Sequence, residues 1–83
     1  MTLLKFWAAW CGPCRVLNNN ILDSKVPYTS VDADEEPDTC EKYNVRNIPT
    51  MIIVDSFGKE VSRKTGIMSA EEIKKWWEEY GKK

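Results

Sequence analysis

A short apolar run leads directly into two cysteines that are separated only by a Gly-Pro pair. Residues 2–7, TLLKFW, are rich in large apolar side chains and predict a buried strand. WCGPC follows at residues 10–14. Because proline suits the first helical turn, we expect a helix from Pro13 onward, with Cys14 and Leu17 on one face. The two sulfur atoms therefore belong to a strand–turn–helix unit, which limits the folds open to the chain.

The rest of the chain continues this alternation of strands and helices. The expected elements are strands at residues 2–7, 26–32, 50–55 and 60–65, a helix from Pro13, a short helix within 32–45, and a last helix from Ser69 to Tyr80. The turn SFGK joins the last two strands into a hairpin. Ser69 and Glu72 have the spacing of a capping box. The apolar arc of the last helix is expected to comprise Ala70, Ile73, Trp76, Trp77 and Tyr80.

The order β-α-β-α-β-β-α predicts an α/β fold. A helical crossover makes the first two strands parallel, and the hairpin makes the last two antiparallel. We therefore expect a four-stranded mixed sheet flanked by helices on both faces. With 83 residues, the chain is long enough for one domain, 1–83, around one hydrophobic core.

Charge and hydropathy exclude several classes of partner. Twelve basic and thirteen acidic residues leave a net charge of −1, so nothing favours nucleic acid or an anionic membrane. No apolar stretch approaches the ~20 residues of a membrane span, and no targeting segment fits before the cysteine pair. We expect a cytoplasmic monomer. Thiols are kept reduced in the cytoplasm, where close cysteine pairs are more often catalytic or metal-binding than structural.

The Cys-x-x-Cys pair has unequal sulfur atoms. Cys11 lies beside the unpaired N–H groups of the helix start, which favour the thiolate and lower its pKa, so we expect Cys11 to be the nucleophile. Cys14 faces the core and is suited to attack a mixed disulfide at Cys11. Pro13 stiffens the turn and Gly12 leaves space above it, so a partner protein can approach the sulfur.

Two other interpretations of the cysteines are weaker. A structural zinc site needs four cysteine or histidine ligands, but the chain has three cysteines and no histidine, so no metal is expected. A purely structural disulfide over so short a loop removes little entropy from the unfolded chain. We expect no bound cofactor, only a redox-active disulfide between Cys11 and Cys14.

Three segments together resemble thioredoxin. WCGPC at residues 10–14 follows FWAAW, VRNIPT at 45–50 is similar to the loop whose proline is cis in that family, and TGIMS at 65–69 is similar to the turn before its last helix. The resemblance implies a minimal thioredoxin fold and reduction of protein disulfides. It also implies that Pro49 is cis, instead of a trans residue that merely begins a strand.

The resemblance implies a docking patch and a set of partners. The patch around Cys11 comprises Trp10, Gly12, Pro13, Ile48, Pro49, Gly66 and Ile67, with the backbone of Ile48 available to pair with a substrate segment. A thioredoxin reductase would recycle the dithiol, and ribonucleotide reductase is a plausible recipient by family analogy.

Two alternative functions remain open at this point. A glutaredoxin-like protein would be recycled by glutathione, but glutaredoxins usually have Pro-Tyr where this chain has Gly-Pro. A thioredoxin-fold binding module without redox activity would not need the intact cysteine pair.

The sequence departs from the family pattern in three places. It begins at the catalytic strand, without the extra strand and helix of typical thioredoxins, so we expect residues 26–32 at a sheet edge, where Pro27 discourages pairing with other chains. Cys40 is an additional cysteine, either packed near Tyr43 or serving as a regulatory or dimer-forming thiol. The third departure is Lys5.

Lys5 occupies the position of a buried aspartate that serves proton transfer in the family. One hypothesis is that Lys5 lies toward the end of the sheet and reaches water along its stem. The other is that Lys5, with Tyr28 from the neighbouring strand, supplies charge beneath the site and lowers the pKa of both thiols.

Overall fold

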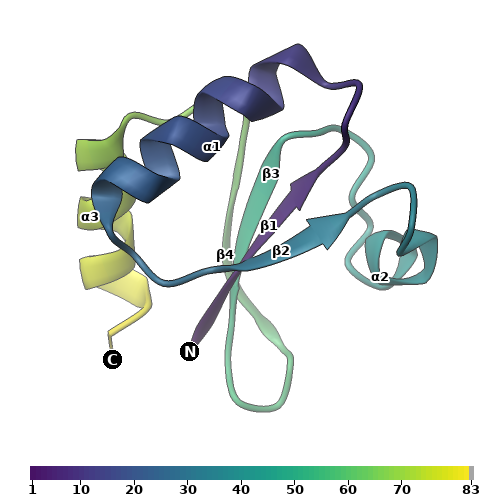
Figure 1. The fold of residues 1–83 in the computed structure, drawn as a ribbon. Coiled ribbons are helices and arrows are strands. Elements are labelled where there is room, and N and C mark those ends of the chain that lie inside the picture. The colour runs from purple at the N-terminus through teal and green to yellow at the C-terminus, as the bar shows by residue number, and fades with distance from the viewer. Residues whose placement is uncertain (83) are drawn as a thin grey trace.

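The expected order of strands and helices is confirmed in a computed structural model that describes residues 1–82. The elements are β1 (Thr2–Trp7), α1 (Gly12–Ser24), β2 (Thr29–Asp32), α2 (Pro37–Lys42), β3 (Thr50–Val54), β4 (Glu60–Thr65) and α3 (Ala70–Tyr80). The four strands form one mixed sheet in the order β2-β1-β3-β4 (Figure 1). β1 is parallel to β2 and antiparallel to β3, and β3 is antiparallel to β4.

The second strand is shorter than expected. β2 begins at Thr29, not at residue 26. The N–H of Val26 donates to Ser24 Oγ at 3.2 Å, and Pro27 has no N–H to offer. These residues therefore connect the end of α1 to the sheet, and the start of this strand was predicted wrongly. β2 does lie at the edge of the sheet in the described residues, but Pro27 precedes it and does not interrupt its pairing.

Helices cover both faces of the sheet. Figure 1 shows α1 and α3 on one side and α2 on the other. The core between the sheet, α1 and α3 includes Leu3, Leu17, Ile21, Met51, Ile53, Ile73, Trp76 and Trp77. The core on the face of α2 comprises Phe6, Val31, Ile52 and Val54, with Leu4, Cys40, Tyr43, Val45 and Ile48 partly buried against it. Alternation along β1 explains the division, because Leu3 and Phe6 point to opposite faces.

The last helix begins with the expected capping box. Ser69 Oγ accepts the N–H of Glu72 at 3.1 Å, and Glu72 Oε1 accepts the N–H of Ser69 at 3.2 Å. These bonds to Ser69 hold the pKa of Glu72 below its usual value. Trp76 and Trp77 are buried as expected. Tyr80, in the last turn, keeps 37% of its surface exposed, so the buried arc is shorter than predicted.

The two ends of the sheet differ in what they carry. At one end, β1 leads into the cysteine segment and Pro49 immediately precedes β3. At the other end lie the N-terminus and the turn between β3 and β4 (Figure 1). No helix among residues 1–82 has both the length and the apolar character needed to cross a membrane.

Candidate active site

Cys11 and Cys14 are joined at the start of α1. Their Cα atoms are 5.3 Å apart, within the range of a disulfide. Cys11 is the N-cap residue of α1, and its Sγ accepts the N–H of Cys14 at 3.2 Å. Pro13 lies in the first turn, where its missing N–H costs the helix no hydrogen bond. The sulfur of Cys11 thus receives one of the unpaired donors of the helix start, as the spacing predicted.

The disulfide is buried, while the turn above it is exposed. Cys11 is 4% exposed and Cys14 is 1% exposed. Both pack with Ala8, and Trp7 and Ile48 cover them. Gly12 and Pro13, between the two cysteines, are exposed. In this oxidised form, the two cysteines differ little in exposure. The difference between them lies in their positions on the helix, because Cys11 is the N-cap residue and its Sγ accepts a backbone N–H.

The loop before β3 lies beside the disulfide. The bond between Ile48 and Pro49 is cis, as the resemblance implied, and Ile48 packs against the cysteines. The N–H of Gly66 donates to the carbonyl oxygen of Pro49 at 2.9 Å, which brings the turn after β4 to the same place. Ile67, the next residue, is 51% exposed. Segments distant in the sequence thus meet at this end of the sheet.

Trp10 has a partner that the sequence analysis missed. Its side chain is 71% exposed, and Nε1 donates to Asp34 Oδ2 at 3.1 Å and to Oδ1 at 3.4 Å. The backbone N–H of Asp34 in turn donates to Asp32 Oδ1 at 2.9 Å. A signal was available, because the parallel strands β1 and β2 end side by side and the segments after them must be neighbours. Asp34 holds the ring of Trp10 beside Cys11.

Lys5 is buried in the middle of β1, so the hypothesis that it reaches water at the end of the sheet was wrong. Its side chain is 4% exposed, and Nζ donates to Asn18 Oδ1. The side chain turns inward because Lys5 shares the face of Leu3, which packs beneath α1. Nζ lies 4.7 Å from the centre of the Tyr28 ring. Burial lowers the pKa of Lys5 below its usual value. The sequence did not indicate Asn18.

Cys40 lies on α2, away from the disulfide. It is partly buried and packs in the core of Phe6 and Ile52, near Tyr43. Burial raises the pKa of this thiol, and the negative charge of Glu36 raises it further. Of the two alternatives for Cys40, the structure shows the packing near Tyr43.

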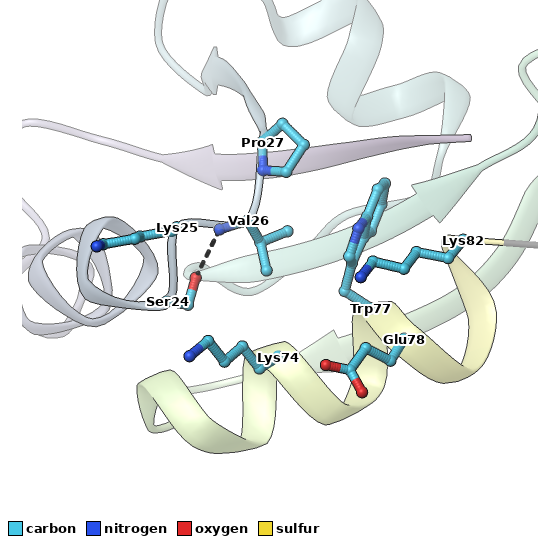
Figure 2. A pocket seen from close by; sticks show the side chains of 8 residues that line it. All are labelled: Ser24, Lys25, Val26, Pro27, Lys74, Trp77, Glu78 and Lys82. Carbon is cyan, nitrogen blue, oxygen red and sulfur yellow. Dashed lines mark hydrogen bonds between the residues drawn. The ribbon is translucent and has the colours of Figure 1, made fainter.

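A pocket lies at the opposite end of α1 from the disulfide. Figure 2 shows it between the end of α1 and α3, with Trp77 as one wall and Lys25, Lys74 and Lys82 around it. None of its lining residues belongs to the site predicted from the sequence. Across the described part of the chain, no three or more histidine, cysteine or acidic side chains are grouped so as to hold a metal ion.

Comparison with known proteins connects this geometry to a family. The family model for thioredoxin matches residues 1–79. The chain belongs to the thioredoxin family. It is 36% identical over 86 residues to thioredoxin 2 of Chlorobaculum tepidum, covering 96% of this chain and 78% of that protein. It is 35% identical over 80 residues to the thioredoxin of Rickettsia bellii, covering 89% of this chain and 75% of that protein.

A solved structure has the same fold. A mutant thioredoxin from Halobacterium salinarum superposes with a TM-score of 0.82 at 30% identity, over 95% of this chain and 73% of that one. As a member of the thioredoxin family, the protein is a thiol-disulfide oxidoreductase that acts on protein disulfides. Thioredoxins need no cofactor besides their redox-active disulfide. The glutaredoxin-like alternative is not better supported by these relatives.

Proposed function

We propose that Cys11 attacks the substrate disulfide and that Cys14 resolves the mixed disulfide formed between Cys11 and the substrate. The observation that carries this assignment is the N–H of Cys14 donating to Cys11 Sγ at the N-cap of α1. A donor at a helix start stabilises a thiolate, which is the attacking species. Cys14 lies within α1 instead of at its N-cap, and it is 1% exposed.

The reaction proceeds in two exchanges. The Cys11 thiolate attacks one sulfur of the substrate disulfide, a Cys11–substrate bond forms, and the other substrate sulfur leaves as a thiolate that takes up a proton. Cys14 then loses its proton and attacks Cys11 Sγ, and the second substrate sulfur leaves. Two electrons pass from the cysteine pair to the substrate, which becomes a dithiol.

We propose that the substrate segment binds across the surface beside Cys11. This docking patch comprises Trp10, Gly12, Pro13, Ile48, Pro49, Gly66 and Ile67. Its large hydrophobic side chains that are exposed belong to Trp10 and Ile67. An extended segment beside Ile48 would pair with the backbone there as an added strand. The hydrogen bond from Trp10 to Asp34 supports the patch by orienting the largest exposed side chain.

Cys14→Ser is expected to hold substrates on Cys11 as stable mixed disulfides. The variant retains the attacking thiolate but lacks the sulfur that releases the substrate. Non-reducing electrophoresis with a disulfide-containing protein such as insulin measures the adduct. Cys14→Ser/Cys40→Ser should give the same amount of adduct, because Cys40 packs in the core on α2. An adduct that requires Cys40, or none with Cys14→Ser, would contradict the assignment.

We propose that a thioredoxin reductase recycles the Cys11–Cys14 disulfide. We also propose ribonucleotide reductase as a recipient of the electrons, and the cytoplasm as the compartment in which the protein works. The support is the similarity to thioredoxins. Insulin reduction should proceed with NADPH and a thioredoxin reductase and be at least about tenfold slower with glutathione and glutathione reductase, because glutathione has one thiol and must complete both exchanges with two separate molecules. Equal or faster recycling by glutathione would instead support the glutaredoxin-like alternative.

A further inference from the structure

Lys5 is a buried cation without an anionic partner in the described residues. It is 4% exposed, and Nζ donates a hydrogen bond to the neutral side chain of Asn18 through Oδ1. The ion pair found within residues 1–82 joins Arg63 to Glu60, so no carboxylate there lies within 4.0 Å of Lys5 Nζ. An unpaired buried ammonium is costly. We therefore expect Lys5 to have a negatively charged partner in another redox state of the protein.

Two neighbours of Lys5 lie on the side of the inner cysteine. Asn18, which accepts the bond from Nζ, is one helical turn after Cys14 on the same face of α1. Trp7, two residues after Lys5 on the same face of β1, has its ring centre 5.9 Å from Nζ and packs against the cluster of Ala8, Cys11 and Cys14. The ammonium therefore lies one layer of side chains below the disulfide.

We propose that the missing counter-charge of Lys5 is the thiolate of Cys14, which makes Lys5 a positioning residue for the second exchange. This inference rests on the proposed role of Cys14. In the disulfide neither sulfur is charged, and Lys5 has no partner. In the mixed disulfide, Cys14 must lose its proton before its sulfur bonds to Cys11 and expels the substrate thiolate. A cation in the low-dielectric interior favours that ionised sulfur.

The surroundings of Lys5 hold little else that changes charge. The neighbouring groups are Ser30 and Met51 on the adjoining strands, Asn18 on α1, and the rings of Trp7 and Tyr28. None of these neighbours is a carboxylate, and the face of the Tyr28 ring favours the ammonium by a cation–π contact. The ionisation of Cys14 can therefore be followed without a competing carboxylate.

Lys5→Met tests this proposal by removing the charge while keeping most of the volume. The reduced protein is mixed with dithiobis-nitrobenzoate, so that Cys11 releases one coloured thionitrobenzoate and Cys14 displaces the second. We expect the second phase to slow about tenfold at pH 7 and its pH midpoint to rise by about one pH unit, because tenfold less Cys14 is ionised. Lys59→Met, an exposed lysine in the turn between β3 and β4, is the matched control and should keep the original profile.

Asn18→Asp provides a second test in which Lys5 is retained. The new carboxylate is nearly isosteric with the amide and gives the ammonium a permanent partner, so the second phase should again move to higher pH.

Lys5→Met should also make the oxidised protein more stable. Burial lowers the pKa of Lys5 in the folded protein, so the charged side chain reduces the free energy of unfolding. This destabilisation is fully present below the lowered pKa and disappears as the pH rises toward 10.5, the usual pKa of lysine.

The outcomes separate this proposal from the proposed function. An unchanged second phase in both Lys5→Met and Asn18→Asp would overturn the role of Lys5 and leave Cys14 as the resolving thiol. If the original protein releases no second thionitrobenzoate, then Cys14 does not resolve the mixed disulfide. The proposed roles of Cys14 and of Lys5 would then both be wrong. A stability loss in Lys5→Met with an unchanged pH profile would show a packing role only.

Discussion

Replacing Cys11 by serine is expected to lower the rate of protein-disulfide reduction by at least about a thousandfold. The attacking species is a thiolate, and a serine hydroxyl in the same place is not ionised near neutral pH. The hydrogen bond from the N–H of Cys14, which favours a charged sulfur, cannot compensate for this difference. Insulin reduction with dithiothreitol as the electron source, followed by turbidity, measures the loss.

Cys40→Ser is the matched control for this experiment. It makes the same chemical change on α2, where the thiol packs with Tyr43 and away from the disulfide. We expect it to retain the original rate within about twofold, because a thiol whose pKa is raised by burial is a poor nucleophile. Reduction by Cys11→Ser well above the rate with dithiothreitol alone, or loss of reduction in Cys40→Ser, would mean that the attacking sulfur is not Cys11.

Phe6→Ala is expected to lower the free energy of unfolding by about 3–5 kcal/mol. Phe6 is fully buried on the face of the sheet covered by α2. Its ring meets that of Tyr43 edge to face, with centroids 6.2 Å apart and planes at 68°. At about 0.05–0.15 kcal/mol per residue, a chain of this size has a total stability of about 4–12 kcal/mol. The variant should therefore unfold at a much lower urea concentration.

Phe57→Ala makes the same substitution at the tip of the turn between β3 and β4. Its side chain is 92% exposed, so we expect a change within about 0.5 kcal/mol. Urea unfolding of the oxidised proteins, followed by circular dichroism, compares the two variants. Similar losses in both would contradict the assignment of Phe6 to the core.

The fold was predictable because local patterns and tertiary packing agree along most of the chain. The strand at Glu60–Thr65 and the capping box at Ser69 were predicted at their observed positions. The start of β2 was not, because it depends on how Ser24 Oγ satisfies the N–H of Val26. That hydrogen bond takes the place of strand pairing at Val26, and the β-propensity of the residues does not reveal it.

The site was predictable where it depends on spacing and less so where it depends on side-chain direction. The place of Cys11 at the helix start follows from the positions of Cys14 and Pro13 along the chain. The burial of Lys5 depends instead on which face of β1 lies beneath α1, and its bond to Asn18 depends on the packing of that helix. Asp34 required knowing that the segments after β1 and β2 meet.

The placement of the cysteines and of the turn between β3 and β4 at opposite ends of the sheet also suits the protein for attachment to a solid support. A cysteine-free chemical handle in the turn near Phe57, or at the N-terminus, would orient every molecule with its disulfide facing the solution. Beads prepared in this way should present a uniform reducing surface, whereas coupling through exposed lysines would give mixed orientations.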